Sequence, residues 1–158
     1  MILLCDEDIG THVPKALRLV RYKTMSLVQK GWRSWKDTEW LTIAGEKGWL
    51  VFSANKKMLK VPEERDTIIK KKVGVVFLNN GEERIDQVLR MLLNKWSWLQ
   101  QIDQNEPRPF AYFVSLKGRP EKQPLASSSN YSSTKTQSTT AKGTPLAVSI
   151  KKQNKGIP

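Results

Sequence analysis

The sequence predicts an α/β domain with a mostly parallel central sheet that helices cover on both faces. Short apolar runs alternate along the chain with longer segments whose apolar residues recur at helical spacing. Strands that alternate with helices of this length imply right-handed crossovers and a buried parallel sheet. The predicted strands span residues 2–5, 22–28, 49–53, 73–78 and 110–116, and the predicted helices span residues 13–20, 36–47, 62–71 and 82–98.

The first two strands and the first helix are short. Residues 2–5 form an apolar run that is typical of a buried strand. The segment 13–20 carries apolar residues at helical spacing, and residues 22–28 alternate well enough for a second strand. Strand, helix and strand therefore form the first unit of the fold.

The next two helices carry recognisable end signals. The helix at 36–47 is expected to stop at Gly48, because glycine readily adopts the left-handed conformation that ends a helix. The apolar run at 49–53 follows as the third strand. Pro62 suits the first position of the next helix, since its missing N–H has no partner there in any case.

The last elements complete the alternation. Residues 73–78 form a fourth buried strand, and Asn80 with Gly81 breaks the chain before a long amphipathic helix at 82–98. Residues 110–116 are expected to add a last strand at an edge of the sheet.

Length and composition narrow the class of protein. A chain of 158 residues can form one domain of ordinary size, and its single cysteine, Cys5, excludes an internal disulfide and reads as a buried, inert thiol. No apolar stretch approaches transmembrane length and no leader peptide is apparent. We therefore expect a cytoplasmic protein without a membrane partner.

The net charge of +12 is unevenly distributed. Residues 117–158 hold 8 Lys and Arg against 1 Asp or Glu, and Ser, Thr, Lys and Gln dominate there. We predict a folded domain at 1–119 and a disordered basic tail at 120–158, because such a segment cannot bury enough apolar area; its patch at 146–150 is the part expected to order on a partner. A basic surround favours RNA or DNA, although charge that merely keeps a protein soluble is about as common.

Oxygen ligands fall where a parallel sheet would bring them together. Asp6 and Asp8 follow the first strand and Asn55 follows the third, at the sheet edge where ligands gather. Asp37 and Glu39 open the helix between those strands. Clustered carboxylates repel one another unless a cation lies among them, and Mg²⁺ prefers a few carboxylates plus water. The pattern predicts a Mg²⁺ or Mn²⁺ site that cleaves phosphodiesters by activating water.

Each acid taken alone also has an ordinary structural explanation. Asp37 can cap a helix, Glu39 can offset the helix dipole, and Asp6 to Asp8 can form a solvated turn. Their clustering at one sheet edge favours the metal site over these explanations.

Basic and aromatic residues accompany the acids. We expect Lys36, Lys56 and Lys57 to contact phosphates of a nucleic acid, although solvated charge has a comparable prior. Trp32 and Trp35 lie in a loop near the acids, where they could stack on an unpaired base. The remaining four tryptophans, Trp40, Trp49, Trp96 and Trp98, are assigned to the core.

Four segments resemble the PIN-like domains grouped with VapC-type toxins. They are LLCDED at 3–8, WKDTEWL at 35–41, GWLVFSANKK at 48–57 and PFA at 109–111, and the resemblance spans residues 1–119. It implies a three-layer α/β/α fold and a metal-dependent endoribonuclease, often a toxin encoded beside a neutralising antitoxin. The partners implied are an RNA substrate, an antitoxin protein and a second copy of the chain.

The resemblance also assigns residues by position. Asp6 matches the first-strand metal ligand, and Asp37 and Glu39 match the acidic pair that opens the following helix. Apart from the resemblance, we expect Asp8 to help hold the metal. Asn55 departs from the pattern, because relatives commonly place Asp there. A neutral amide still offers an oxygen but adds no charge, so the predicted catalytic set is Asp6, Asp37, Glu39 and Asn55.

Two other functions compete with this prediction. Asn55 raises the alternative of a catalytically degenerate module that only binds nucleic acid or protein. A signalling receiver shares the acids after the first strand but requires an acceptor Asp after the third, where this chain has Asn55.

Overall fold

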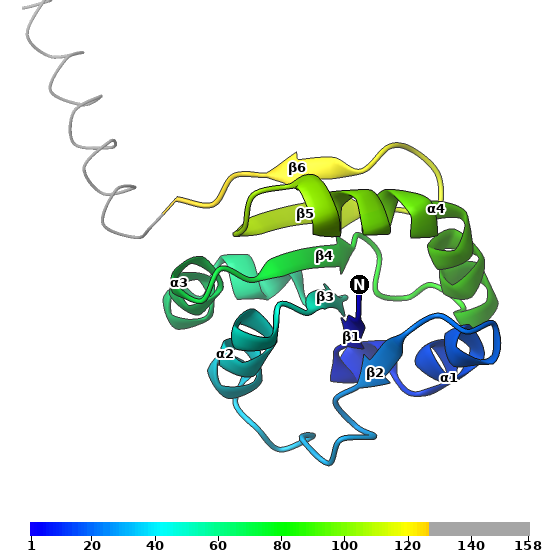
Figure 1. Cartoon of the computed structure of the whole chain (residues 1–158), viewed down its shortest axis with the longest axis horizontal. Coiled ribbons are helices and arrows are strands. Elements are labelled where there is room, and N and C mark those ends of the chain that lie inside the picture. Colours follow the sequence, from blue (N-terminus) through cyan, green and yellow to red (C-terminus); the bar gives the residue numbers. More distant parts are fainter. Residues whose placement is uncertain (127–158) are drawn as a thin grey trace, which may run out of the picture. The chain divides into compact units, whose positions relative to one another are not determined.

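A single mostly parallel sheet organises the protein. The computed structural model describes residues 1–126, and its six strands follow the order β2-β1-β3-β4-β5-β6 (Figure 1). Neighbouring strands from β2 to β5 are parallel, whereas β6 pairs antiparallel with β5. The strands are β1 (Leu3–Cys5), β2 (Thr24–Ser26), β3 (Leu50–Ser53), β4 (Gly74–Leu78), β5 (Phe110–Val114) and β6 (Glu121–Gln123).

Two pairs of helices cover the two faces of the sheet. Figure 1 shows α1 and α4 on one side of the strands and α2 and α3 on the other. The helices are α1 (His12–Leu19), α2 (Asp37–Lys47), α3 (Pro62–Lys70) and α4 (Ile85–Asn105), with 3₁₀ turns η1 (Glu7–Ile9) and η2 (Lys56–Leu59). This three-layer α/β/α arrangement confirms the predicted fold class. Within residues 1–126, no helix is long and apolar enough to cross a membrane.

Alternating side chains of each strand enter two separate cores. In β3, Phe52 faces the core that α1 and α4 cover, whereas Val51 faces the core that α2 and α3 cover. Successive residues of a strand point to opposite faces, so a sheet buried on both sides needs apolar residues at every position. Cys5 follows this rule as a fully buried residue, and burial raises the pKa of its thiol to about 12.

The helix α2 ends where the sequence predicts. Gly48 has a φ of 66°, and its N–H bonds back to the last turn of the helix. Only glycine adopts this left-handed conformation without cost, which lets the chain turn directly into β3.

The C-terminal boundary of the domain differs from the prediction. The strand β5 is internal rather than at an edge, because β6 pairs with it. The predicted disorder from residue 120 is therefore wrong for Glu121–Gln123, and one compact unit reaches Leu125. The sequence does not predict this strand, because its three residues show no alternation of apolar and polar side chains. The rest of the predicted tail, including the patch at 146–150, lies outside the described residues.

Gly45 tests the close contact between α2 and the end of α3. A Cβ atom on Gly45 would lie 2.3 Å from the backbone oxygen of Lys71. We expect Gly45→Ala to lower the free energy of unfolding by about 1–3 kcal/mol, measured by urea denaturation. Glycine to alanine inside an uncrowded helix has the opposite sign, by up to ~1 kcal/mol. Ser97→Ala, on the exposed side of α4, is the control. If Gly45→Ala is more stable than the parent, the close contact is contradicted.

Candidate functional site

An open cleft with acidic walls lies at the carboxyl ends of β1 and β3. These two strands are neighbours in the sheet, so the loops that follow them start side by side. The cavity measures about 540 Å³. Its lining, which we call the acidic cleft, consists of Asp6, Glu7, Asp8, Asp37, Ala54, Asn55, Lys57 and Gly81. The structure thus brings together four of the predicted site residues, Asp6, Asp8, Asp37 and Asn55, with Lys57 beside them.

Ser53 ties the loop after β1 to the end of β3. Its hydroxyl donates to Oδ2 of Asp6 at 2.8 Å and accepts the backbone N–H of Asn55 at 2.9 Å. The backbone N–H of Ala54 donates to Oδ2 of Asp8 at 3.1 Å. Ser53 is fully buried, and Asp6 is only 6% exposed. These contacts hold the two carboxylates in position beside the end of β3.

Sequence reasoning did not identify Ser53 as a site residue. A signal was present, because Ser53 is the one polar residue of an otherwise apolar strand and stands directly before the predicted site. A buried hydroxyl needs a hydrogen-bond partner, and here the partner is a carboxylate.

The electrostatics of the cleft disfavour three negative charges without a cation. Burial, and then the charge of Asp8, raises the pKa of Asp6 to about 7, although the bonds from Ser53 and the backbone oppose this shift. Burial also raises the pKa of Asp8, and the charge of Asp37 adds to the shift on both groups. A cation in the cleft would relieve this repulsion.

Asp37 faces the cleft from the first turn of α2. The indole N–H of Trp40 donates to Oδ1 of Asp37 at 3.0 Å, which orients the carboxylate. On its other side Asp37 borders a second cavity of about 340 Å³. We call this the side cavity, and its lining consists of Trp35, Lys36, Asp37, Thr38, Glu63 and Glu64.

Glu64 is a second acid that sequence reasoning missed as a site neighbour. Its position in the first turn of α3 suggested only a favourable interaction with the helix dipole. In the structure it lies beside Asp37, and burial together with that carboxylate raises the pKa of Glu64. Its Oε2 atom is buried and has no hydrogen-bond partner among the described residues. Only the packing of α3 against α2 brings these acids together, and spacing along the chain does not show it.

Glu39 does not join the other acids, which corrects the predicted ligand set. Its Oε2 atom accepts the backbone N–H of Lys36 at 2.9 Å, and the side chain does not line the acidic cleft. The physical reason is the free N–H at the start of α2, which a Glu three residues along the chain can reach.

A magnesium ion suits the remaining donors. Among residues 1–126, no three His, Cys, Asp or Glu side chains lie close enough together to hold a metal ion. Mg²⁺ often uses only one or two carboxylates and keeps several waters. Asp6 and Asp8, which converge on Ser53 and repel each other, match that requirement.

The predicted basic residues are divided between three places. Lys57 lines the acidic cleft, and Lys36 lines the side cavity. Lys56 turns away, because its Nζ atom donates to Oδ1 of Asn79 at 2.9 Å and lies over the ring of Phe113. Lys57 and Lys36 therefore remain candidates for phosphate contacts at this site. Lys56 instead contacts residues at the ends of the neighbouring strands.

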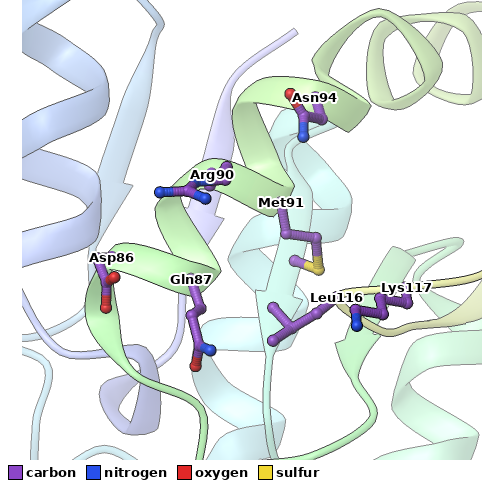
Figure 2. A pocket seen from close by; sticks show the side chains of 7 residues that line it. All are labelled: Asp86, Gln87, Arg90, Met91, Asn94, Leu116 and Lys117. Carbon is purple, nitrogen blue, oxygen red and sulfur yellow. The ribbon is translucent and has the colours of Figure 1, made fainter.

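Another cavity, of about 280 Å³, lies between α4 and the segment after β5 (Figure 2). Met91 and Leu116 point toward each other there, and exposed polar side chains surround them. Its lining holds one carboxylate, Asp86, so it lacks the converging charges of the acidic cleft.

The raised pKa of Asp6 predicts a pH-dependent cost to stability. The folded protein holds this proton up to about pH 7, whereas an unfolded Asp loses it near pH 4, so stability from this group falls as the pH rises through that window. We expect Asp6→Asn to raise the free energy of unfolding at pH 8 without divalent ions, by about 1–3 kcal/mol. Urea denaturation at pH 5 and pH 8 should show this advantage shrinking at pH 5. If Asp6→Asn is less stable than the parent at pH 8, the charge of Asp6 does not destabilise the folded protein as proposed.

Comparison with known proteins identifies the family. No curated protein and no solved structure matches the chain. A family model described as a PIN like domain matches residues 1–80, a segment that contains β1 to β4 and every residue that lines the acidic cleft except Gly81. The family and its nuclease-type fold agree with the carboxylates that follow β1 and open α2, and the chain belongs to the PIN-like domain family.

Proposed function

We propose that this protein is a metal-dependent endoribonuclease that works at the acidic cleft. The observation that carries the proposal is the pair of carboxylates formed by the buried Asp6 and the more exposed Asp8, which lie 2.8 and 3.5 Å from one hydroxyl of Ser53. Burying one carboxylate beside a second like charge is costly for stability and useful for binding a divalent cation. The net charge of +12 supports a polyanionic substrate.

Five residues in and beside the cleft have roles in this mechanism, namely Asp6, Asp8, Ser53, Asp37 and Lys57. Asp6 and Asp8 would hold Mg²⁺ or Mn²⁺, which when bound lowers the pKa of water and neutralises charge on phosphate oxygens. Ser53 fixes the direction of the Asp6 carboxylate. Trp40 orients the carboxylate of Asp37 through Oδ1, and we assign this carboxylate the role of orienting and deprotonating an attacking water. Lys57 neutralises a substrate phosphate on the rim.

We further propose a VapC-type toxin in the cytoplasm, neutralised by an antitoxin protein and active as a homodimer. The motif at 35–41 supports this assignment through its resemblance to that group. Growth of cells that express the parent or the Asp6→Asn variant tests this assignment. The parent should arrest growth and Asp6→Asn should not, since toxicity requires the same carboxylate as RNA cleavage.

RNA cleavage tests the proposed activity directly. Purified protein should cut a single-stranded RNA with Mg²⁺ or Mn²⁺ and stop when a chelator is added. Asp6→Asn should lower the cleavage rate by at least about 100-fold, because it removes one of the two carboxylates that face the metal. Asp86→Asn, an exposed acid on α4, serves as the matched control and should cut like the parent. If the parent cuts nothing with either ion, the nuclease proposal is wrong.

Asn55 distinguishes an active nuclease from a module that only binds. Its side chain lines the acidic cleft, where a carboxylate would add charge beside Asp6 and Asp8. If the site is active but weakened, Asn55→Asp should tighten Mg²⁺ binding by about tenfold, seen as a lower Mg²⁺ concentration for half-maximal cleavage. A degenerate binding module would instead show salt-sensitive RNA binding and no turnover in either protein.

A further inference from the structure

Two tryptophans beside the site form a stack with one open side. The rings of Trp32 and Trp35 lie 4.6 Å apart and are inclined by only 15°. The ammonium group of Lys30 lies 4.8 Å from the ring of Trp32 and 5.1 Å from that of Trp49. The Trp32 ring thus contacts both Trp35 and Lys30, whereas Trp35 is 39% exposed.

Core packing and backbone hydrogen bonds hold the stack in place. Trp32 packs against the core that α2 and α3 cover. Its backbone N–H bonds to the oxygen of Leu27, and the N–H of Trp35 bonds to the oxygen of Trp32, both at 3.0 Å. A ring that is already fixed loses little conformational entropy when a ligand stacks on it. Trp35 is therefore prepared as a contact surface.

Exposure of this ring needs an explanation. Six large apolar side chains are exposed among the described residues, and Trp35 is the one aromatic among them. An aromatic face at the surface beside positive charge is the feature that single-stranded nucleic acids use, because every unpaired base has a face to offer. Arg33, with an exposed guanidinium group, and the exposed Lys36 are close to Trp35 in the sequence.

The open ring lies next to the proposed catalytic groups. Trp35 and Lys36 line the side cavity, and Asp37 lines both this cavity and the acidic cleft. Arg33 pairs with Glu7 on the rim of the acidic cleft at 3.3 Å. A nucleic-acid strand in the acidic cleft can therefore extend past Asp37 to Trp35.

We propose that the exposed face of Trp35 stacks on one unpaired base of the RNA, and so selects single-stranded over duplex substrate. This inference rests on the proposed function. A base inside a duplex is already stacked on both faces, so it cannot use the ring. The stacked base positions a neighbouring phosphodiester at the acidic cleft, while Lys36 contacts the backbone.

An oligonucleotide series with single abasic positions tests this stacking. Binding is measured by fluorescence anisotropy with Mg²⁺, in the Asp6→Asn background so that the RNA is not consumed. Replacing Trp35 by Ala should weaken binding of a single-stranded RNA by roughly 5- to 150-fold, and Trp35→Phe should retain most of it. One abasic position should weaken binding to the protein that keeps Trp35, and this effect should vanish with Trp35→Ala. Leu19→Ala, which truncates an exposed apolar residue on α1, is the control.

The outcomes separate this inference from the proposed function. The stacking is supported if an abasic position weakens RNA binding by the protein that keeps Trp35 but not by Trp35→Ala. Both proteins should then bind duplex RNA equally. If the parent cuts RNA but Trp35→Ala binds it as tightly and keeps the abasic effect, the stacking is wrong and the nuclease proposal stands. If the parent neither cuts nor binds RNA, both are wrong. Thermal unfolding of each variant confirms that it is folded before binding is compared.

Discussion

The hydroxyl of Ser53 is the contact on which the geometry of the site depends. Ser53 ends β3, and parallel pairing places it next to the point where the chain leaves β1. By donating to Asp6 and accepting from the N–H of Asn55, it fixes the loops of both strands at once. The N–H of Ala54 then holds Asp8 in the adjacent position. A slip of β3 by one residue would turn Ser53 to the opposite face and separate the carboxylates.

Burial of Asp6 beside the charge of Asp8 opposes stability, and the two cores compensate for it. The strands β1, β3 and β4 are buried along their whole length, with helices on both sides. Apolar burial on that scale tolerates a few kcal/mol lost at one edge of the sheet. The loss is confined to the carboxyl ends of β1 and β3, where the acids meet the solvent. A site of this kind needs a rigid sheet beneath it, since a mobile support would let the like charges move apart.

The sequence predicted the sheet and its helices because each carries a local signal. Apolar runs mark the internal strands, and Gly48 and Pro62 mark helix ends. The strand at Glu121–Gln123 has no such pattern, since it forms only because β5 offers an unpaired edge. The acidic cleft was predictable in part, because acids that follow parallel strands must share one edge. Glu64 was not, since the contact between α2 and α3 decides its place.

Glu39 shows why a motif position does not fix a chemical role. The same spacing that suggests a second ligand after Asp37 also suits a helix cap, and the free N–H of Lys36 decides between them. That bond holds the backbone between Trp35 and Asp37, the residues that face the side cavity and the acidic cleft. Glu39 therefore acts on the site by positioning the start of α2. One hydrogen bond to the backbone of Lys36 thus helps to place the aromatic ring and the carboxylate on either side of it.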